Sequence, residues 1–220
     1  MCAIIGSFSE KKIMELVEKN QHRGKVAYSL ASFERDGSHV EIVYGKGEFD
    51  PKVFRQLRTD GRYMVCHLQS PTNTDAADTG YRQPSVITGS SNTSYLWHNG
   101  ILMPQTMGMI SQVFGIESRF DTHLLHHWLE HNEALDKIEG SFACVYMGGD
   151  ARNIKIFRSR HAKLYVDLET MTMSSERFDG SRCINADRVY DVDLVSGKLS
   201  IASYFKTKRF NINIKGELDD

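Results

Sequence analysis

Hydrophobic and polar residues follow each other along most of this chain at the spacing of β-strands. Short apolar or alternating runs, bounded by Gly, Asn, Asp or Ser, predict buried or half-buried strands. The runs cover residues 2–6, 26–33, 40–44, 62–67, 85–87, 93–97, 141–147, 154–158, 165–166, 171–174, 189–194 and 199–204. The last two flank Ser196-Gly197 and predict a hairpin.

Helices are predicted mainly in the middle of the chain and near its start. Ser9 and Asp121 are candidate N-caps, because each has a side-chain oxygen and stands just before a helical pattern. The predicted helices are 10–20, 53–57, 105–114 and 122–130. A polar loop is expected over 69–82. Strands at both ends with helices between them indicate an α+β fold of layered antiparallel sheets.

Composition and charge narrow the class of protein. The chain has 220 residues, of which 40% are hydrophobic and 25% charged, as in ordinary globular proteins, and we expect a single domain over 1–220. The 27 basic and 28 acidic side chains give a net charge of −1. This balance lacks the basic excess that binding to nucleic acid or to an anionic membrane usually needs.

Two further features bear on the cellular setting. No apolar run approaches the roughly 18 residues of a membrane helix, and the N-terminus does not read as a signal peptide. The four cysteines, at 2, 66, 144 and 183, form no CxxC pair. Reduced thiols in a cytoplasmic protein are therefore expected, with Cys66, Cys144 and Cys183 in the core.

Cys2 is the first candidate for chemistry. Removal of Met1 would place a thiol and a free α-amine on one residue. An α-amine has a pKa of about 7.7–8.0, so it can accept the thiol proton and later return it to a leaving group. The plain alternative is a small apolar residue at the start of a strand.

His98-Asn99-Gly100, directly after an apolar strand, is the second candidate. An Asn side-chain amide and a Gly backbone N–H at a strand end can form an oxyanion hole, a device worth about 3 kcal/mol per donor. The plain alternative is a turn, since Asn-Gly is a common turn dipeptide.

Several motifs, taken together and in order, resemble those of class II glutamine amidotransferases, which usually begin Met-Cys-Gly-Ile-x-Gly. The similarity is greatest to the glutaminase domains of asparagine synthetase and glucosamine-6-phosphate synthase. The matching stretches are Met1-Cys2-Ala3-Ile4-Ile5-Gly6, His22-Arg23-Gly24, His67, Gln83-Pro84, Asn99-Gly100, Phe120-Asp121-Thr122, Glu139-Gly140-Ser141-Phe142-Ala143, Arg158-Ser159-Arg160-His161 and Ser174-Ser175-Glu176. They extend over nearly the whole chain.

The resemblance implies a fold and a reaction. The fold would be the four-layer αββα sandwich of N-terminal nucleophile hydrolases. Cys2 would attack the side-chain amide of glutamine, Asn99 and Gly100 would hold the oxyanion, and Asp121 would bind the substrate ammonium. No cofactor or metal is implied. The ammonia would pass to a separate synthase, because this chain contains no synthetase half.

The sequence departs from the family pattern near the substrate carboxylate. The family usually has an Arg two residues after the strand-ending His, and this sequence has His67-Leu68-Gln69. A neutral amide cannot supply the charge-assisted, bidentate bond of a guanidinium. Arg82 is the candidate to compensate, so we place His67, Gln69 and Arg82 with Asp121 in the predicted substrate site.

Three alternative functions therefore stay open beside the glutaminase. One is an amidohydrolase of the same fold acting on another γ-glutamyl compound or amide. The second is a catalytically silent module that binds a partner, and the third is an unrelated α+β binding protein. His123, His127 and His131 raise a separate question, since they share one helix face and could bind zinc, although a polar surface is the simpler reading.

Overall fold

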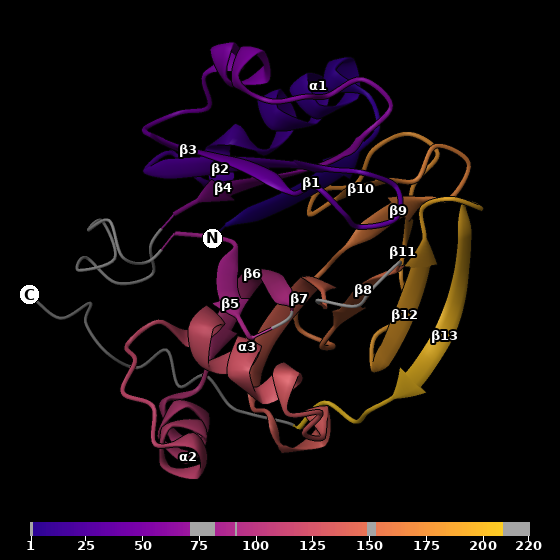
Figure 1. Ribbon diagram of the computed structural model, residues 1–220. Coiled ribbons are helices and arrows are strands. Elements are labelled where there is room, and N and C mark those ends of the chain that lie inside the picture. Colours follow the sequence, from indigo (N-terminus) through magenta and orange to yellow (C-terminus); the bar gives the residue numbers. More distant parts are fainter. Residues whose placement is uncertain (1, 71–81, 91, 149–152, 209–220) are drawn as a thin grey trace, which may run out of the picture.

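The computed structural model describes residues 2–70, 82–90, 92–148 and 153–208. Two antiparallel sheets lie face to face, with α1 on the outer side of one sheet and α2 and α3 on the outer side of the other (Figure 1). This arrangement confirms the predicted α+β class and its four-layer αββα order.

The first sheet holds the N-terminal strand near its middle. Seven strands of the described residues pair in the order β11-β9-β10-β1-β4-β2-β3. Their bounds are β1 Ala3–Ser7, β2 Ala27–Phe33, β3 Glu41–Lys46, β4 Tyr63–Gln69, β9 Tyr165–Asp167, β10 Thr172–Ser174 and β11 Arg182–Cys183. Every pairing is antiparallel, with Ile4 opposite His67 and Ile5 opposite Ser174.

The second sheet carries the longest strand of the candidate site, β6. Six strands, again counted over the described residues, pair in the order β13-β12-β8-β7-β6-β5. Their bounds are β5 Ser85–Thr88, β6 Thr93–Leu102, β7 Gly140–Met147, β8 Asn153–Arg158, β12 Arg188–Asp193 and β13 Lys198–Tyr204. The predicted hairpin across Ser196-Gly197 is β12–β13, in which Asp193 pairs with Lys198.

Helices form the outer layers. The α-helices are α1 Glu10–Asn20, α2 Pro104–Phe114 and α3 Asp121–Glu130, and the short 3-10 helices are η1 Gln21–Arg23, η2 Pro51–Gln56 and η4 Leu135–Lys137. Ser9 caps α1 as predicted, because its side chain accepts a hydrogen bond from the Lys12 N–H. The predicted 53–57 helix is the 3-10 turn η2, which begins at Pro51.

Apolar residues form a core on each side of the first sheet. In β1, Ala3 and Ile5 pack toward α1, whereas Ile4 packs into the space between the sheets. Successive strand residues point to opposite faces, so a strand covered on both sides is apolar throughout. This explains why residues 3–7 are all buried.

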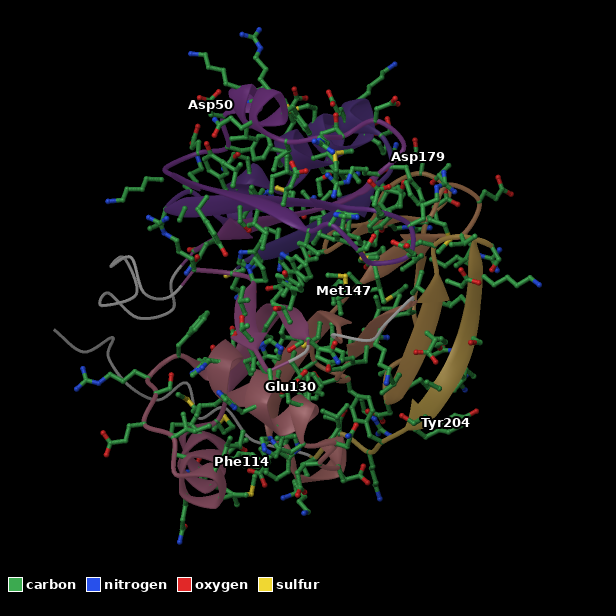
Figure 2. The ribbon with its side chains drawn as sticks, in the orientation of Figure 1. Asp50, Phe114, Glu130, Met147, Asp179 and Tyr204 are labelled. Carbon is green, nitrogen blue, oxygen red and sulfur yellow. The ribbon has the colours of Figure 1, made fainter. Side chains whose placement is uncertain are left out.

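One apolar core lies between each pair of neighbouring layers. The middle core lies between the sheets and includes Val65 from β4 and Trp97 from β6. Figure 2 shows side chains filling this space, with Met147 of the same core labelled. A further core packs α2 and α3 on the second sheet, around Leu96 and Trp128. The described helices include none that is both long and apolar enough to cross a membrane.

Some expected boundaries were wrong in ways that matter for the site. Strand β6 continues to Leu102, so Asn99-Gly100 lies inside a strand and not in a turn after it. Helix α3 begins at Asp121, with Phe120 as N-cap. Cys66 and Cys144 are buried as expected, but Cys183 on the edge strand β11 is exposed. Most of the predicted loop 69–82 lies outside the described residues.

Candidate functional site

Cys2 stands directly before β1 and is half-buried. Its Sγ lies 3.4 Å from the Ser70 carbonyl oxygen, just past the end of β4. Burial raises the pKa of the Cys2 thiol, and the nearby Asp121 carboxylate raises it further, whereas Arg23 lowers it. An unassisted thiol here is therefore mainly protonated at neutral pH and needs a base to become a nucleophile.

Arg23 fixes the backbone of Cys2. Its Nε donates to the Cys2 carbonyl oxygen at 3.1 Å, and its Nη1 donates to Glu176 Oε1 at 2.6 Å. The arginine is largely buried, with 15% of its side chain exposed, so this ion pair is better shielded from water than a surface pair. Glu176 thus holds the guanidinium that in turn holds the first residue of the site.

The Asn99 side chain reaches from the second sheet to the first through one hydroxyl. Asn99 Nδ2 donates to Ser175 Oγ at 3.0 Å. The same Oγ accepts the Ile4 N–H at 2.9 Å, and the Ser175 N–H donates to the Ile4 carbonyl at 3.0 Å. Asn99 is therefore tethered to a residue only two positions after Cys2.

Gly100 occupies a position that no other residue can fill. A Cβ there would lie 1.8 Å from the Ser141 carbonyl oxygen, far inside van der Waals contact. Gly100 is opposite Phe142 of β7, but the Phe142 N–H and C=O bond to Ser159, on the other side of β7. The Gly100 N–H therefore points to the edge of β6 that faces away from β7.

Asp121 lies at the first turn of α3, with 19% of its side chain exposed. Its Oδ2 accepts the Leu102 N–H at 3.1 Å, and its Oδ1 accepts the Thr122 N–H at 2.7 Å. A carboxylate at a helix N-terminus is stabilised by the helix dipole. These bonds fix Asp121 against β6, and its negative charge raises the pKa of the Cys2 thiol.

Two buried histidines lie in this region, His98 next to Asn99 on β6 and His67 on β4. Burial lowers the pKa of His67 to about 3, and burial also lowers the pKa of His98, although Asp121 opposes that shift. Both imidazoles are therefore neutral at pH 7. The Nε2 atom of each has no hydrogen-bond partner among the described residues.

Gln69 and Arg82 occupy the region of the predicted carboxylate clamp. Gln69 is the last residue of β4 and is buried, and its carbonyl accepts the Val26 N–H at 3.1 Å. The Arg82 guanidinium lies over the Tyr44 ring, 5.6 Å from its centroid. Their shared role in substrate binding stays a prediction.

Gly24 shows why the His22-Arg23-Gly24 segment fits here. A Cβ on Gly24 would lie 2.5 Å from the Leu68 carbonyl carbon, so only glycine lets this turn approach the end of β4. His22, in contrast, is exposed and lies 3.9 Å from Glu176. The segment therefore serves the site through Arg23 and Gly24.

The sequence analysis assigned no individual role to four residues that the structure places in this network, Arg23, Gln83, Ser175 and Glu176. Ser175 and Glu176 lie in a stretch that the resemblance had matched, so a signal for them existed. Gln83, in the Gln-Pro pair, bonds both polar backbone groups of His98.

The remaining histidine pattern lies on the outer side of α3. His123 Nε2 is 3.2 Å from His127 Nε2, and the His131 ring stacks on Phe114 with centroids 4.4 Å apart. Among the described residues, no group of three or more His, Cys, Asp or Glu is placed to hold a metal ion. His126 differs from the series, since it is fully buried between two serines.

A hollow of about 570 Å³ lies elsewhere, between the end of α3 and the outer face of the second sheet. Glu130 and Tyr204, both labelled in Figure 2, are among the residues that line it. None of the predicted site residues lines this hollow.

Comparison with known proteins was informative for structure only. No protein-family model matches the sequence, and no curated protein matches it. Among solved structures, glutamine phosphoribosylpyrophosphate amidotransferase from B. subtilis, in complex with ADP and GMP, aligns over 97% of this chain and 50% of its own, with 16% identity and a TM-score of 0.67. A structure described as the allosteric regulatory enzyme of purine biosynthesis aligns with the same values.

The chain thus spans about half the length of these two proteins. At 16% identity, the likeness speaks for the fold and not for the reaction. It agrees with the resemblance found in the motifs, because the protein to which the fold is similar is a glutamine amidotransferase. The chain therefore has a glutamine amidotransferase-like fold.

Proposed function

We propose that this chain hydrolyses the side-chain amide of L-glutamine through a thioester on Cys2 and delivers ammonia to a separate synthase. The observation that carries the proposal is a pair of hydrogen bonds that meet at Ser175 Oγ, one from Asn99 Nδ2 and one from the Ile4 N–H. It ties the Asn99 amide to Ile4 and so keeps an oxyanion donor beside the nucleophile. Gly100 and Asp121 complete the arrangement from the same strand and from the adjoining helix.

In the proposed mechanism the α-amine of Cys2, exposed once Met1 is removed, accepts the proton of the thiol. The Sγ atom then attacks the carboxamide carbon, and the carbonyl oxygen becomes an oxyanion between Asn99 Nδ2 and the Gly100 N–H. The C–N bond breaks as the ammonium of Cys2 returns its proton to the leaving nitrogen. Water then attacks the thioester carbon and releases glutamate and the thiol.

Asp121 would bind the α-ammonium of the substrate, since one carboxylate can accept several hydrogen bonds at once. The opposite end of the substrate would meet Gln69, Arg82 and His67. Because Gln69 is neutral, we also keep a second candidate, an amidohydrolase for another γ-glutamyl compound or amide. A substrate panel separates these two candidates.

The test is the intact mass of the purified protein before and after incubation with 6-diazo-5-oxo-L-norleucine, a reactive glutamine mimic. We expect loss of Met1 and a single adduct on Cys2, with no adduct in Cys2→Ala. Because Cys183 is also an exposed thiol, Cys183→Ser serves as the matched control and should label as the wild type does.

Each other outcome points elsewhere. A processed Cys2 that a general thiol reagent labels, but the mimic does not, favours the amidohydrolase. Retained Met1 with no adduct contradicts both enzymes and favours a silent binding module. For the ammonia acceptor, a pull-down that returns no amidating enzyme counts against a separate synthase.

A further inference from the structure

Gln83 is a buried amide with all its polar hydrogens in use. It is 5% exposed. Its Oε1 accepts the His98 N–H at 2.5 Å, and its Nε2 donates to the His98 carbonyl at 2.7 Å and to Thr122 Oγ1 at 3.2 Å. One side chain therefore bonds both backbone groups of the residue before Asn99 and also the second residue of α3.

The side chain of Gln83 takes the place of a missing strand residue. In the β5–β6 pair, Ser85 is opposite Leu96. The same register would bring Gln83 opposite His98, but β5 begins only at Ser85. The Gln83 amide has the same donor and acceptor as a peptide group, so it continues the pairing to His98.

The bonds between Gln83 and His98 lie next to the proposed oxyanion donors, Asn99 and Gly100. In an antiparallel strand the N–H groups of alternate residues point to the same edge, so those of His98, Gly100 and Leu102 share one edge of β6. Gln83 occupies this edge at His98, and Asp121 Oδ2 occupies it at Leu102. The Gly100 N–H lies between the two.

We propose that Gln83 is a positioning residue, which holds the Asn99–Gly100 donors and Asp121 in one geometry without touching the substrate. It acts on the donors through the His98 backbone, and on Asp121 through Thr122 at the start of α3. The inference rests on the proposed function for its catalytic consequence. Its structural part stands on these bonds alone.

The first test does not depend on activity. Gln83→Met keeps the length of the side chain and removes every polar bond, so amide hydrogen exchange at 98–102 should become at least about tenfold faster. The matched control is Ser94→Ala, which removes a buried bond between the same strand and the same helix, to His126 at 2.9 Å. Ser94→Ala should leave exchange at 98–102 unchanged.

The second test is kinetic. Gln83→Met should lower kcat for glutamine hydrolysis by about tenfold to a hundredfold, since small displacements of catalytic groups are costly, whereas KM changes less than about threefold. Ser94→Ala should retain wild-type kcat. If Gln83→Met does not fold, Gln83→Glu replaces it, because a carboxylate still accepts the His98 N–H but cannot donate to its carbonyl.

The outcomes are distinct. Unchanged exchange at 98–102 in a folded Gln83 variant overturns the positioning role. Faster exchange with unchanged kcat per folded molecule shows that Gln83 only stabilises the strand, which also overturns it. A wild-type protein that neither hydrolyses glutamine nor labels with the mimic overturns the proposed function, and the exchange result then still decides whether Gln83 holds the backbone of 98–102.

Discussion

Two groups of polar side chains on or beside α3 look equally conspicuous in sequence but differ in structure. Where α3 meets β6, the side chains of His98, Asn99 and Asp121 are bonded to backbone groups or to hydroxyls of neighbouring segments. On the outer side of α3, His123 and His127 bond to each other and remain partly exposed.

The difference lies in what each side chain is bonded to. A bond to a backbone group of another segment fixes the position of both partners, and burial makes its loss costly. A bond between two side chains on one exposed helix face fixes little, because water can replace it. We therefore expect mutations where α3 meets β6 to change activity or stability, and mutations on the outer side of α3 to change neither by much.

The largest effect is expected at Asn99. Asn99→Ala removes one oxyanion donor, so kcat for glutamine hydrolysis should fall by about 10²- to 10³-fold, as measured by ammonia release. Ser175→Ala is the matched variant, since it keeps the Asn99 amide and removes the hydroxyl that anchors both this amide and the Ile4 N–H. A smaller loss in Ser175→Ala is expected, and an equal loss would make Asn99 a structural residue.

The next effect concerns His126, midway along α3. Burial lowers the pKa of His126 to about 3, from an ordinary value of 6.5. Between these two pH values the unfolded chain binds a proton that the folded chain does not, so the free energy of unfolding falls as the pH drops. One such imidazole contributes up to about 1.4 kcal/mol per pH unit.

His126→Gln removes that titration, so its unfolding free energy should depend less steeply on pH between 6.5 and 3. Urea unfolding at several pH values measures the slope. Part of the slope should remain, because burial lowers the pKa of His67 in the same direction. A variant as steep as the wild type would show that His126 is not held neutral in the fold.

The smallest effect is expected on the outer side of α3. The double variant His123→Ala/His127→Ala should change the free energy of unfolding by no more than about 0.5 kcal/mol and leave glutamine hydrolysis unchanged. Thermal unfolding and the ammonia assay check the two parts. A marked loss of activity would contradict the contrast between the outer side of α3 and the side chains where α3 meets β6.

The sequence predicted the types and order of most elements and proposed residues for the site. Cys2, Asn99, Gly100 and Asp121 could be proposed because their motifs occur in a familiar order. The boundaries of β6 could not, since His98-Asn99-Gly100 has the composition of a turn. The strand continues because Gly100 alone fits against Ser141 and because Gln83 pairs with His98.

The pattern of hydrophobic and polar residues could not predict the contacts between distant segments. Asn99 and Ser175 are 76 residues apart, and their bond depends on how two separate sheets are aligned. Gln83 was visible as part of a motif, but its side-chain amide pairs with His98 because β5 begins only at Ser85, two residues later. Neither arrangement follows from local propensity, which describes one segment at a time.

The hydroxyl of Ser175 bridges the gap between the two sheets. It accepts one bond from Ile4, in the strand that follows Cys2, and one from Asn99 in β6. The middle core, with Val65 and Trp97, acts as the spacer that sets this gap. Under the proposed mechanism, the packing of residues remote from the substrate would set the distance over which the Cys2 sulfur attacks.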